Sequence, residues 1–225
     1  MLRTLWSVKG GSGVTVTSAG LALVLARRRA TVLVDLAGDL PAVLGIADPH
    51  GPGWCDWLAT SEHDPEVLPR LLVPVAENLR LLPVGGSGVG SSDASVGADG
   101  VDGVDEAVSA LAALGSEVVV DAGRRGVDTA PALVDAAASA GRSVLVTRAC
   151  YLSLRRVVRG GVRADSVALV LDAGRALDRR DVADVTGLRV DATIEVDPAV
   201  ARGVDAGLLV RRPNRSFCRS LEALT

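Results

Sequence analysis

A short segment near the N-terminus, Lys9–Thr15 (KGGSGVT), limits most strongly what this chain can fold into. It follows an apolar run over residues 2–8 that is typical of a buried strand, and it leads into an apolar stretch over residues 16–26 that is long enough for a helix. Glycines let the backbone N–H groups of such a turn point toward one ligand, and the N-terminus of the helix adds positive potential. The segment therefore predicts a phosphate-binding loop; the alternative is a tight strand-to-helix turn that binds nothing.

Lys9 is the only lysine in the chain, although Lys and Arg together number 24. All the other members of that set are arginines. An ammonium group on a flexible stem acts as a point charge for phosphate, unlike the planar guanidinium of arginine. A single lysine at the edge of the glycine turn therefore favours a role in ligand binding, with chance placement as the alternative.

The composition sets further limits. The chain has 225 residues, of which 48% are hydrophobic and only 2% aromatic, so Val, Leu and Ala must build the core. The formal net charge of −3 gives no overall basic field for nucleic acid. Cys55, Cys150 and Cys218 are far apart and predict free thiols, and two histidines are too few for a zinc site. No segment is typical of a signal peptide or a membrane span, so we expect a cytoplasmic protein.

Short runs rich in β-branched residues alternate with helix-like segments along the chain. This alternation predicts an α/β fold in a single domain over residues 1–225: a doubly wound, mostly parallel sheet of about seven strands with helices on both faces. The predicted strands cover residues 2–8, 31–35, 78–84, 117–121, 143–147, 166–172 and 190–196. The predicted helices cover residues 16–26, 54–58, 64–72, 104–114, 129–140, 152–160, 178–186 and 198–206, and a loop with a short helix is expected over residues 38–45. Two segments depart from the alternation: a Gly/Ser-rich excursion over residues 85–103, expected to be flexible, and a basic C-terminal tail over residues 211–225.

Two aspartates end predicted strands, Asp35 after TVLV and Asp121 after EVVV. Ligands of parallel sheets bind at the carboxyl ends of the strands, where the glycine turn also lies. An aspartate at that edge, together with the hydroxyl of Thr15 at the start of the helix, is typical of a Mg²⁺ site beside a phosphate loop. The alternative for Asp121 is an aspartate that only caps a loop.

These features together resemble the ParA/MinD family of P-loop ATPases, members of the SIMIBI class with a deviant phosphate loop of pattern KGGxGK[ST]. The segment Lys9–Thr15 matches that pattern except at one position. Further segments stand in the order that the family shows, and they extend the resemblance over nearly the whole chain. They are VLVD (32–35), VVVDAGRRG (118–126), SVLVTRACYLSLRR (143–156) and VDPAVARGVDAGLLV (196–210).

The resemblance implies a protein that binds ATP or ADP with Mg²⁺ and forms an ATP-dependent homodimer. It implies that Lys9 reaches the nucleotide of the partner subunit, that Thr15 and Asp121 hold the metal, and that Asp35 belongs to the catalytic edge. The residues that would surround the nucleotide are Lys9, Gly10, Gly11, Ser12, Gly13, Val14, Thr15 and Val16. The implied role is the positioning or partitioning of DNA or of a cellular machine, with a protein partner from that system.

Two positions depart from the family pattern. Val14 stands where the family has a second lysine that clamps the β- and γ-phosphates. Losing one charge-assisted contact costs about 1.5–3 kcal/mol, or roughly 10- to 100-fold in affinity. The family also has an Asp-x-Asp triplet whose second acid positions the attacking water, and here that position is Ala37, with Asp39 as a nearby substitute. We therefore expect ATP hydrolysis to be slow or absent.

A loop with the first lysine but without the second resembles one branch of the family, the CpaE/TadZ-like proteins of pilus assembly. The surface on which such a protein would act is a separate question. The basic stretch near the C-terminus could make weak contact with DNA or with a membrane surface, which would place the protein at the nucleoid or the membrane; the alternative is a solvated tail. Its arginines are Arg211, Arg212, Arg215 and Arg219.

Two other functions remain open on the sequence. The first is an ATPase-like scaffold that binds no nucleotide and acts only through partners. The second is an NAD(P)-dependent oxidoreductase, because Gly11-x-Gly13 after a strand and Asp35 at the end of the next imitate a dinucleotide-binding motif. The third glycine of that motif is replaced by Val16, which would crowd the helix against the strand.

Overall fold

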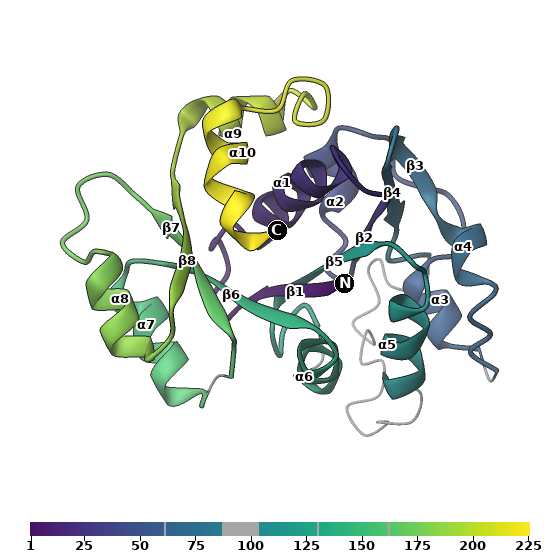
Figure 1. Ribbon diagram of the computed structural model, residues 1–225, viewed down its shortest axis with the longest axis horizontal. Helices are drawn as coiled ribbons and strands as arrows, with labels where there is room; N and C mark the ends of the chain where they lie inside the picture. The colour runs from purple at the N-terminus through teal and green to yellow at the C-terminus, as the bar shows by residue number, and fades with distance from the viewer. Residues whose placement is uncertain (61, 87–103, 130, 162) are drawn as a thin grey trace.

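The computed structural model describes residues 1–60, 62–86, 104–129, 131–161 and 163–225, and Figure 1 shows their arrangement. Eight strands form one sheet in the order β3-β4-β2-β5-β1-β6-β7-β8. All neighbours pair in parallel except β3 and β4. The strands are β1 (Leu2–Ser7), β2 (Thr31–Asp35), β3 (Val73–Ala76), β4 (Leu79–Leu82), β5 (Glu117–Arg124), β6 (Arg142–Arg148), β7 (Ser166–Leu171) and β8 (Val190–Glu195).

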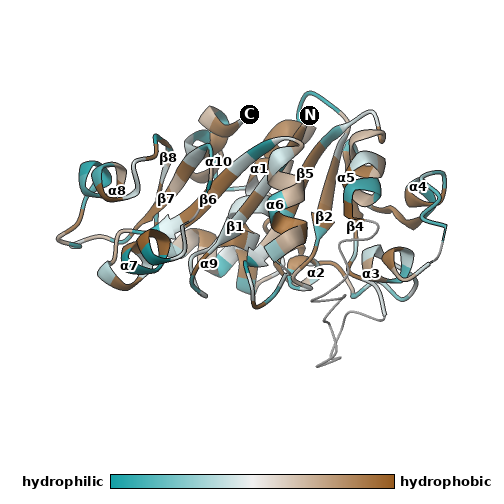
Figure 2. Ribbon diagram, turned by 90° about the horizontal axis from the view of Figure 1, so that it is seen from below, coloured by the Kyte–Doolittle hydropathy of each residue, from teal (hydrophilic) through white to brown (hydrophobic). Residues whose placement is uncertain are grey.

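Helices cover both faces of this sheet and make three layers (Figure 2). One face carries α1 (Val14–Ala26), α2 (Leu40–Leu44), α9 (Pro198–Asp205) and α10 (Arg215–Leu221), the last followed by the 3₁₀ turn η1 (Glu222–Leu224). The other face carries α3 (Trp54–Leu58), α4 (Leu68–Leu71), α5 (Val104–Ala112), α6 (Pro131–Ser139), α7 (Tyr151–Arg159) and α8 (Arg179–Thr186). The α/β class and the doubly wound, three-layer arrangement expected from the sequence are confirmed.

Successive strand residues supply two separate hydrophobic cores. In β5, Val119 packs with α1 and α10, whereas Val118 and Val120 pack with the helices of the opposite face. Side chains alternate between the two faces of a strand, so a strand buried on both sides needs a continuous apolar run. The runs VLV in β2 and VVV in β5 meet this need.

The sheet has one strand more than expected. The sequence prediction placed a helix over residues 64–72 and no strand between it and residue 78, but only Leu68–Leu71 is helical and Val73–Ala76 forms β3. This short strand folds back as a hairpin and pairs antiparallel with β4, with Ala76 opposite Leu79. The tight turn at residues 77–78 lets it pair without a crossover helix.

The C-terminal segment, expected as a basic tail, is a helix docked on the protein. Phe217, Cys218 and Leu221 of α10 are buried against α1, and Asn214 caps the helix by accepting a hydrogen bond from Phe217 N. Glycine at position 20 makes the contact close, because a Cβ there would lie 2.4 Å from the Phe217 ring. The four arginines of the stretch, Arg211, Arg212, Arg215 and Arg219, are all exposed.

Other expectations concern segments that the structure describes only in part. Of the excursion predicted over residues 85–103, all but the first two residues lie outside the described part of the chain. Cys55, Cys150 and Cys218 form no disulfide. None of the described helices combines the length and apolar character needed to cross a bilayer.

Candidate functional site

The glycine loop joins β1 to α1 at the carboxyl edge of the sheet. Gly11 and Gly13 have φ of +71° and +88°, in the left-handed region that favours glycine. Gly13 caps α1, and its carbonyl accepts the hydrogen bond from Thr17 N. The carbonyl of Lys9 accepts hydrogen bonds from Ser12 Oγ at 2.6 Å and from Ser7 Oγ at 3.1 Å. The loop therefore keeps its shape through its own glycines and hydroxyls.

The space in front of the loop is open. A Cβ placed on Gly11 would meet no atom within 4 Å, and one placed on Gly10 would meet only Arg124 Nη1, at 3.8 Å. Among the described residues, no backbone or apolar side chain comes that close to a Cβ on either residue, unlike Gly20, which a helix covers. Because no neighbouring atom would clash with a side chain at these positions, a ligand has room to approach the backbone N–H groups of the loop.

Asp121 lies behind the loop, and one of its two carboxylate oxygens has no hydrogen-bond partner among the described residues. Its Oδ1 accepts hydrogen bonds from Gly123 N at 3.3 Å and Ser18 Oγ at 3.5 Å, while the buried Oδ2 has no hydrogen-bond partner in the part of the chain that the structure describes. Burial raises the pKa of Asp121 to about 7 and the charge of Asp35 adds to the rise, while the Thr15 hydroxyl opposes it. A cation is the natural partner for such a carboxylate, and a hydroxyl beside a carboxylate suits Mg²⁺.

Asp35 lies next to Asp121, since β2 and β5 pair these two residues directly. Its carboxylate is already occupied: Oδ1 accepts hydrogen bonds from the N–H groups of Ala37 and Gly38, and Oδ2 from that of Leu40. Burial raises the pKa of Asp35 to about 6, although these three hydrogen bonds lower it. Asp35 therefore holds the loop that leads into α2 and has little freedom to act on a ligand.

The other residues of this edge take different places. Asp39 is exposed at the start of α2 and caps nothing with its side chain. Val14, the first residue of α1, is buried in the core, so this position supplies no cation where the family pattern has a clamp lysine. The Lys9 ammonium turns back onto its own loop and donates to the Gly10 carbonyl at 3.3 Å.

A pocket of 260 Å³ opens beside Gly13 that the sequence analysis missed. Its lining is mostly apolar, with Val16 and Val170 near the loop and Ile194 and Val200 from β8 and α9. The charged residues that also line it are Arg148, Glu195, Asp197 and Asp205. Val16, which would crowd a dinucleotide-type turn, instead lines this pocket. The pocket continues directly from the loop, so a molecule with a phosphate at Gly13 has an apolar surface for its other end.

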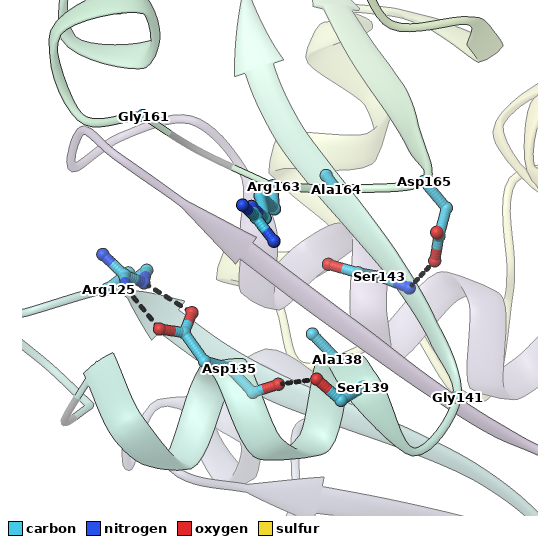
Figure 3. A pocket seen from close by; sticks show the side chains of 10 residues that line it. All are labelled: Arg125, Asp135, Ala138, Ser139, Gly141, Ser143, Gly161, Arg163, Ala164 and Asp165. Atoms are coloured by element: carbon cyan, nitrogen blue, oxygen red, sulfur yellow. Dashed lines mark hydrogen bonds and ion pairs between the residues drawn. The ribbon is translucent and has the colours of Figure 1, made fainter.

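A second, larger pocket of 640 Å³ lies away from the glycine loop (Figure 3). It is built from α6 and from the amino ends of β6 and β7. Its charged groups are paired: Arg125 makes two hydrogen bonds with Asp135, and Asp165 accepts one from Ser143 N (Figure 3). None of the residues expected from the sequence lines it.

The strand order decides between two related folds. In the classic dinucleotide-binding order, the first and second strands are neighbours. Here β5 lies between β1 and β2, so Asp121 and the glycine loop are adjacent and Asp35 stands one strand further away. This order, together with the occupied carboxylate of Asp35, does not fit the oxidoreductase alternative.

Several solved structures have the same arrangement of strands and helices. The ParA family ATPase from Chlorobium tepidum superposes with a TM-score of 0.76 over 100% of this chain and 98% of its own, at 19% identity. MinD from Pyrococcus horikoshii, complexed with Mg-ADP, superposes with a TM-score of 0.69 over 99% and 93%, at 18% identity. This is the ParA/MinD fold. The MinC:MinD complex from Aquifex aeolicus also matches, with a TM-score of 0.70 over 97% and 92%, at 19% identity.

The ParA/MinD fold is recognised here by structure. No family model matches the sequence, and a comparison with curated proteins found no match. The glycine loop, Thr15 and Asp121 are brought together at one edge of the sheet, and Asp35 and Asp39 lie nearby. Of the C-terminal arginines, Arg215 and Arg219 lie in α10, and Arg211 and Arg212 lie in the turn before it.

Proposed function

We propose that this protein binds a nucleotide, ATP or ADP, together with Mg²⁺ at the glycine loop. The observation that carries the proposal is the unpartnered Oδ2 of Asp121 beside Thr15, directly behind an open loop of glycines. Thr15 and Asp121 would hold the metal, which supplies positive charge to the phosphates. The N–H groups from Gly10 to Thr15 would bind the phosphates, and the apolar pocket beside Gly13 would take the base.

The affinity for ATP should be modest. MinD from Pyrococcus horikoshii, which has the same fold, was solved with Mg-ADP. The present loop has Val14 where that family's pattern has its clamp lysine. Backbone donors and the metal remain, so binding persists at a cost of roughly 10- to 100-fold.

Hydrolysis should be slow or absent. Ala37 has no group that could orient a water molecule, and Asp35 is engaged by backbone N–H groups. Asp39 is exposed and would have to turn toward the nucleotide to take that role. We infer a protein whose nucleotide changes its association rather than one that turns over rapidly.

The cellular role that fits this fold is the positioning or partitioning of DNA or of a cellular machine. The nucleotide would control a homodimer in which Lys9 reaches the partner subunit, as the family resemblance implies. A protein partner would bind the dimer. The MinC:MinD complex is an example in which a protein of the same fold binds another protein. The exposed arginines over α10 would give at most a weak contact with DNA or a membrane surface.

Calorimetry with Mg-ATP, combined with sedimentation of the same samples, tests the proposal. We expect wild type to bind and to dimerise with ATP, and Lys9→Ala to bind but to remain monomeric. Asp121→Ala should need far more Mg²⁺ for the same binding. If wild type shows no binding at millimolar Mg-ATP, the nucleotide proposal is wrong and the scaffold alternative takes its place.

A further inference from the structure

Arg124 lies beside the glycine loop through the pairing of two strands. It is the last residue of β5, and β1 pairs Ser7 with it directly, two residues before Lys9. The following residue continues the contact, since Arg125 N donates to Ser7 O at 2.9 Å. The Arg124 guanidinium reaches Gly10, since its Nη1 would lie 3.8 Å from a Cβ placed on that glycine.

The donors of Arg124 are largely unused. Its Nε is buried and has no hydrogen-bond partner in the described part of the chain. Its Nη2 approaches Asp128 Oδ1 only at 3.5 Å, a long contact for an ion pair. Arg125, by contrast, pairs its Nε and Nη2 with Asp135 at 3.0 and 2.6 Å. A guanidinium with unused donors is able to donate hydrogen bonds to an anion as well as to Asp128.

Other cations near the loop are less suited to this task. Lys9 donates to the Gly10 carbonyl, and Arg156 Nη1 reaches only the carbonyl of Val8, at 3.4 Å. Arg148, at the end of β6, donates from Nη1 to both carboxylate oxygens of Asp172. Its Nε has no partner among the described residues, but its side chain lines the pocket beside Gly13. Of these groups, Arg124 is the one that combines an unpaired Nε, among the described residues, with a position against Gly10.

We propose that Arg124 binds the phosphates of the nucleotide at the glycine loop and supplies the positive charge that is missing at Val14. The proposal rests on nucleotide binding at this loop. The cation would come from the end of β5 instead of from the helix, so it would approach the phosphates from the side of Asp121. Its planar fork can donate two hydrogen bonds to one phosphate group, which a lysine cannot do in the same way.

Titration of Mg-ATP by calorimetry into wild type, Arg124→Ala, Arg124→Lys and Arg125→Ala tests this assignment. We expect Arg124→Ala to lose about 10- to 100-fold in affinity, and Arg124→Lys to recover part of that loss. Arg125→Ala is the matched control, because it removes a neighbouring arginine that is paired with Asp135, and we expect it to bind as wild type does. Thermal unfolding without nucleotide checks that each variant is folded.

The outcomes separate this inference from the proposed function. If wild type binds Mg-ATP and Arg124→Ala binds within twofold of it, Arg124 is not a phosphate ligand, although nucleotide binding stands. An equal loss of Mg-ATP affinity in Arg125→Ala would also overturn the assignment. The loss would then reflect the removal of any nearby positive charge and not a specific contact of Arg124. If wild type does not bind at all, both proposals fail together.

Discussion

At the scale of single residues, the site is governed by two buried carboxyl groups on adjacent strands. Asp35 and Asp121 lie in register, and burial raises the pKa of the first to about 6 and of the second to about 7. The backbone N–H groups around Asp35 offset part of the cost of burying its charge. Asp121 has one oxygen without a hydrogen-bond partner among the described residues, so without a bound cation its charge is the more costly of the two to bury.

Both raised pKa values make stability depend on pH, and Asp121, with the larger rise, contributes more than Asp35. Its pKa in the folded protein lies above the ordinary value of 3.8, so the folded state holds the proton more tightly than the unfolded state. Stability without metal should therefore fall as the pH rises from about 4 to about 7. At pH 8 we expect Asp121→Asn to have a free energy of unfolding about 1–3 kcal/mol higher than that of wild type. Near pH 4 we expect the two proteins to be equally stable.

Urea unfolding at the two pH values measures this effect. Asp39→Asn serves as the control because Asp39 belongs to the same edge but is exposed, and it should change little. A loss of stability in Asp121→Asn at pH 8 would mean that the carboxylate already has a favourable partner in the apo protein.

At the scale of elements, the packing of α10 on α1 depends on Gly20. An alanine Cβ there would lie 2.4 Å from Phe217 Cε1 and 2.7 Å from Leu221 Cδ1, so the buried helix would have to shift. We expect Gly20→Ala to destabilise the protein by about 1–3 kcal/mol in thermal or urea unfolding.

Gly203 in α9 provides the matched control for that substitution. It is also a helical glycine, but a Cβ there would meet nothing within 4 Å. Gly203→Ala should leave stability unchanged or raise it by up to about 1 kcal/mol. Equal effects of the two substitutions would argue against close packing of α10.

Local patterns were enough to predict most elements and the glycine loop. The parallel strands are continuous apolar runs, and Gly11 and Gly13 stand where left-handed φ values are required. β3 was missed because VPVA is only four residues long and contains a proline. Arg124 and the pocket beside Gly13 were missed for another reason: their positions depend on the pairing of β1 with β5 and on the placement of α9, which no local pattern encodes.

At the scale of the whole molecule, both chain ends meet at one buried charge cluster. Glu117 accepts hydrogen bonds from Arg3 and Arg29, each at 2.6 Å, and Arg3 Nε donates to Leu224 O at 2.9 Å. The marked termini lie near each other in both ribbon views (Figures 1 and 2). The cluster thus joins the first strand, the central strand and the last turn of the chain.

Removing the negative charge should weaken the entire fold. The side chains of Arg3 and Glu117 are only 4% and 5% exposed, so Glu117→Gln would leave a buried cation without its counter-charge. We expect a loss of about 3 kcal/mol or more in urea unfolding at pH 7. Glu77→Gln, at an exposed turn, should stay within about 0.5 kcal/mol of wild type.

The short antiparallel strand β3 has a consequence for how copies of this molecule can meet. It forms one outer boundary of the sheet, with four residues, alternating exposure and a proline at position 74 that has no N–H to donate. Such a boundary is a poor template for adding a strand from another chain, a route by which sheets grow into aggregates. If copies of this chain gather at one place, as the proposed role would require, the β3 side of the sheet would resist fusion through strand pairing.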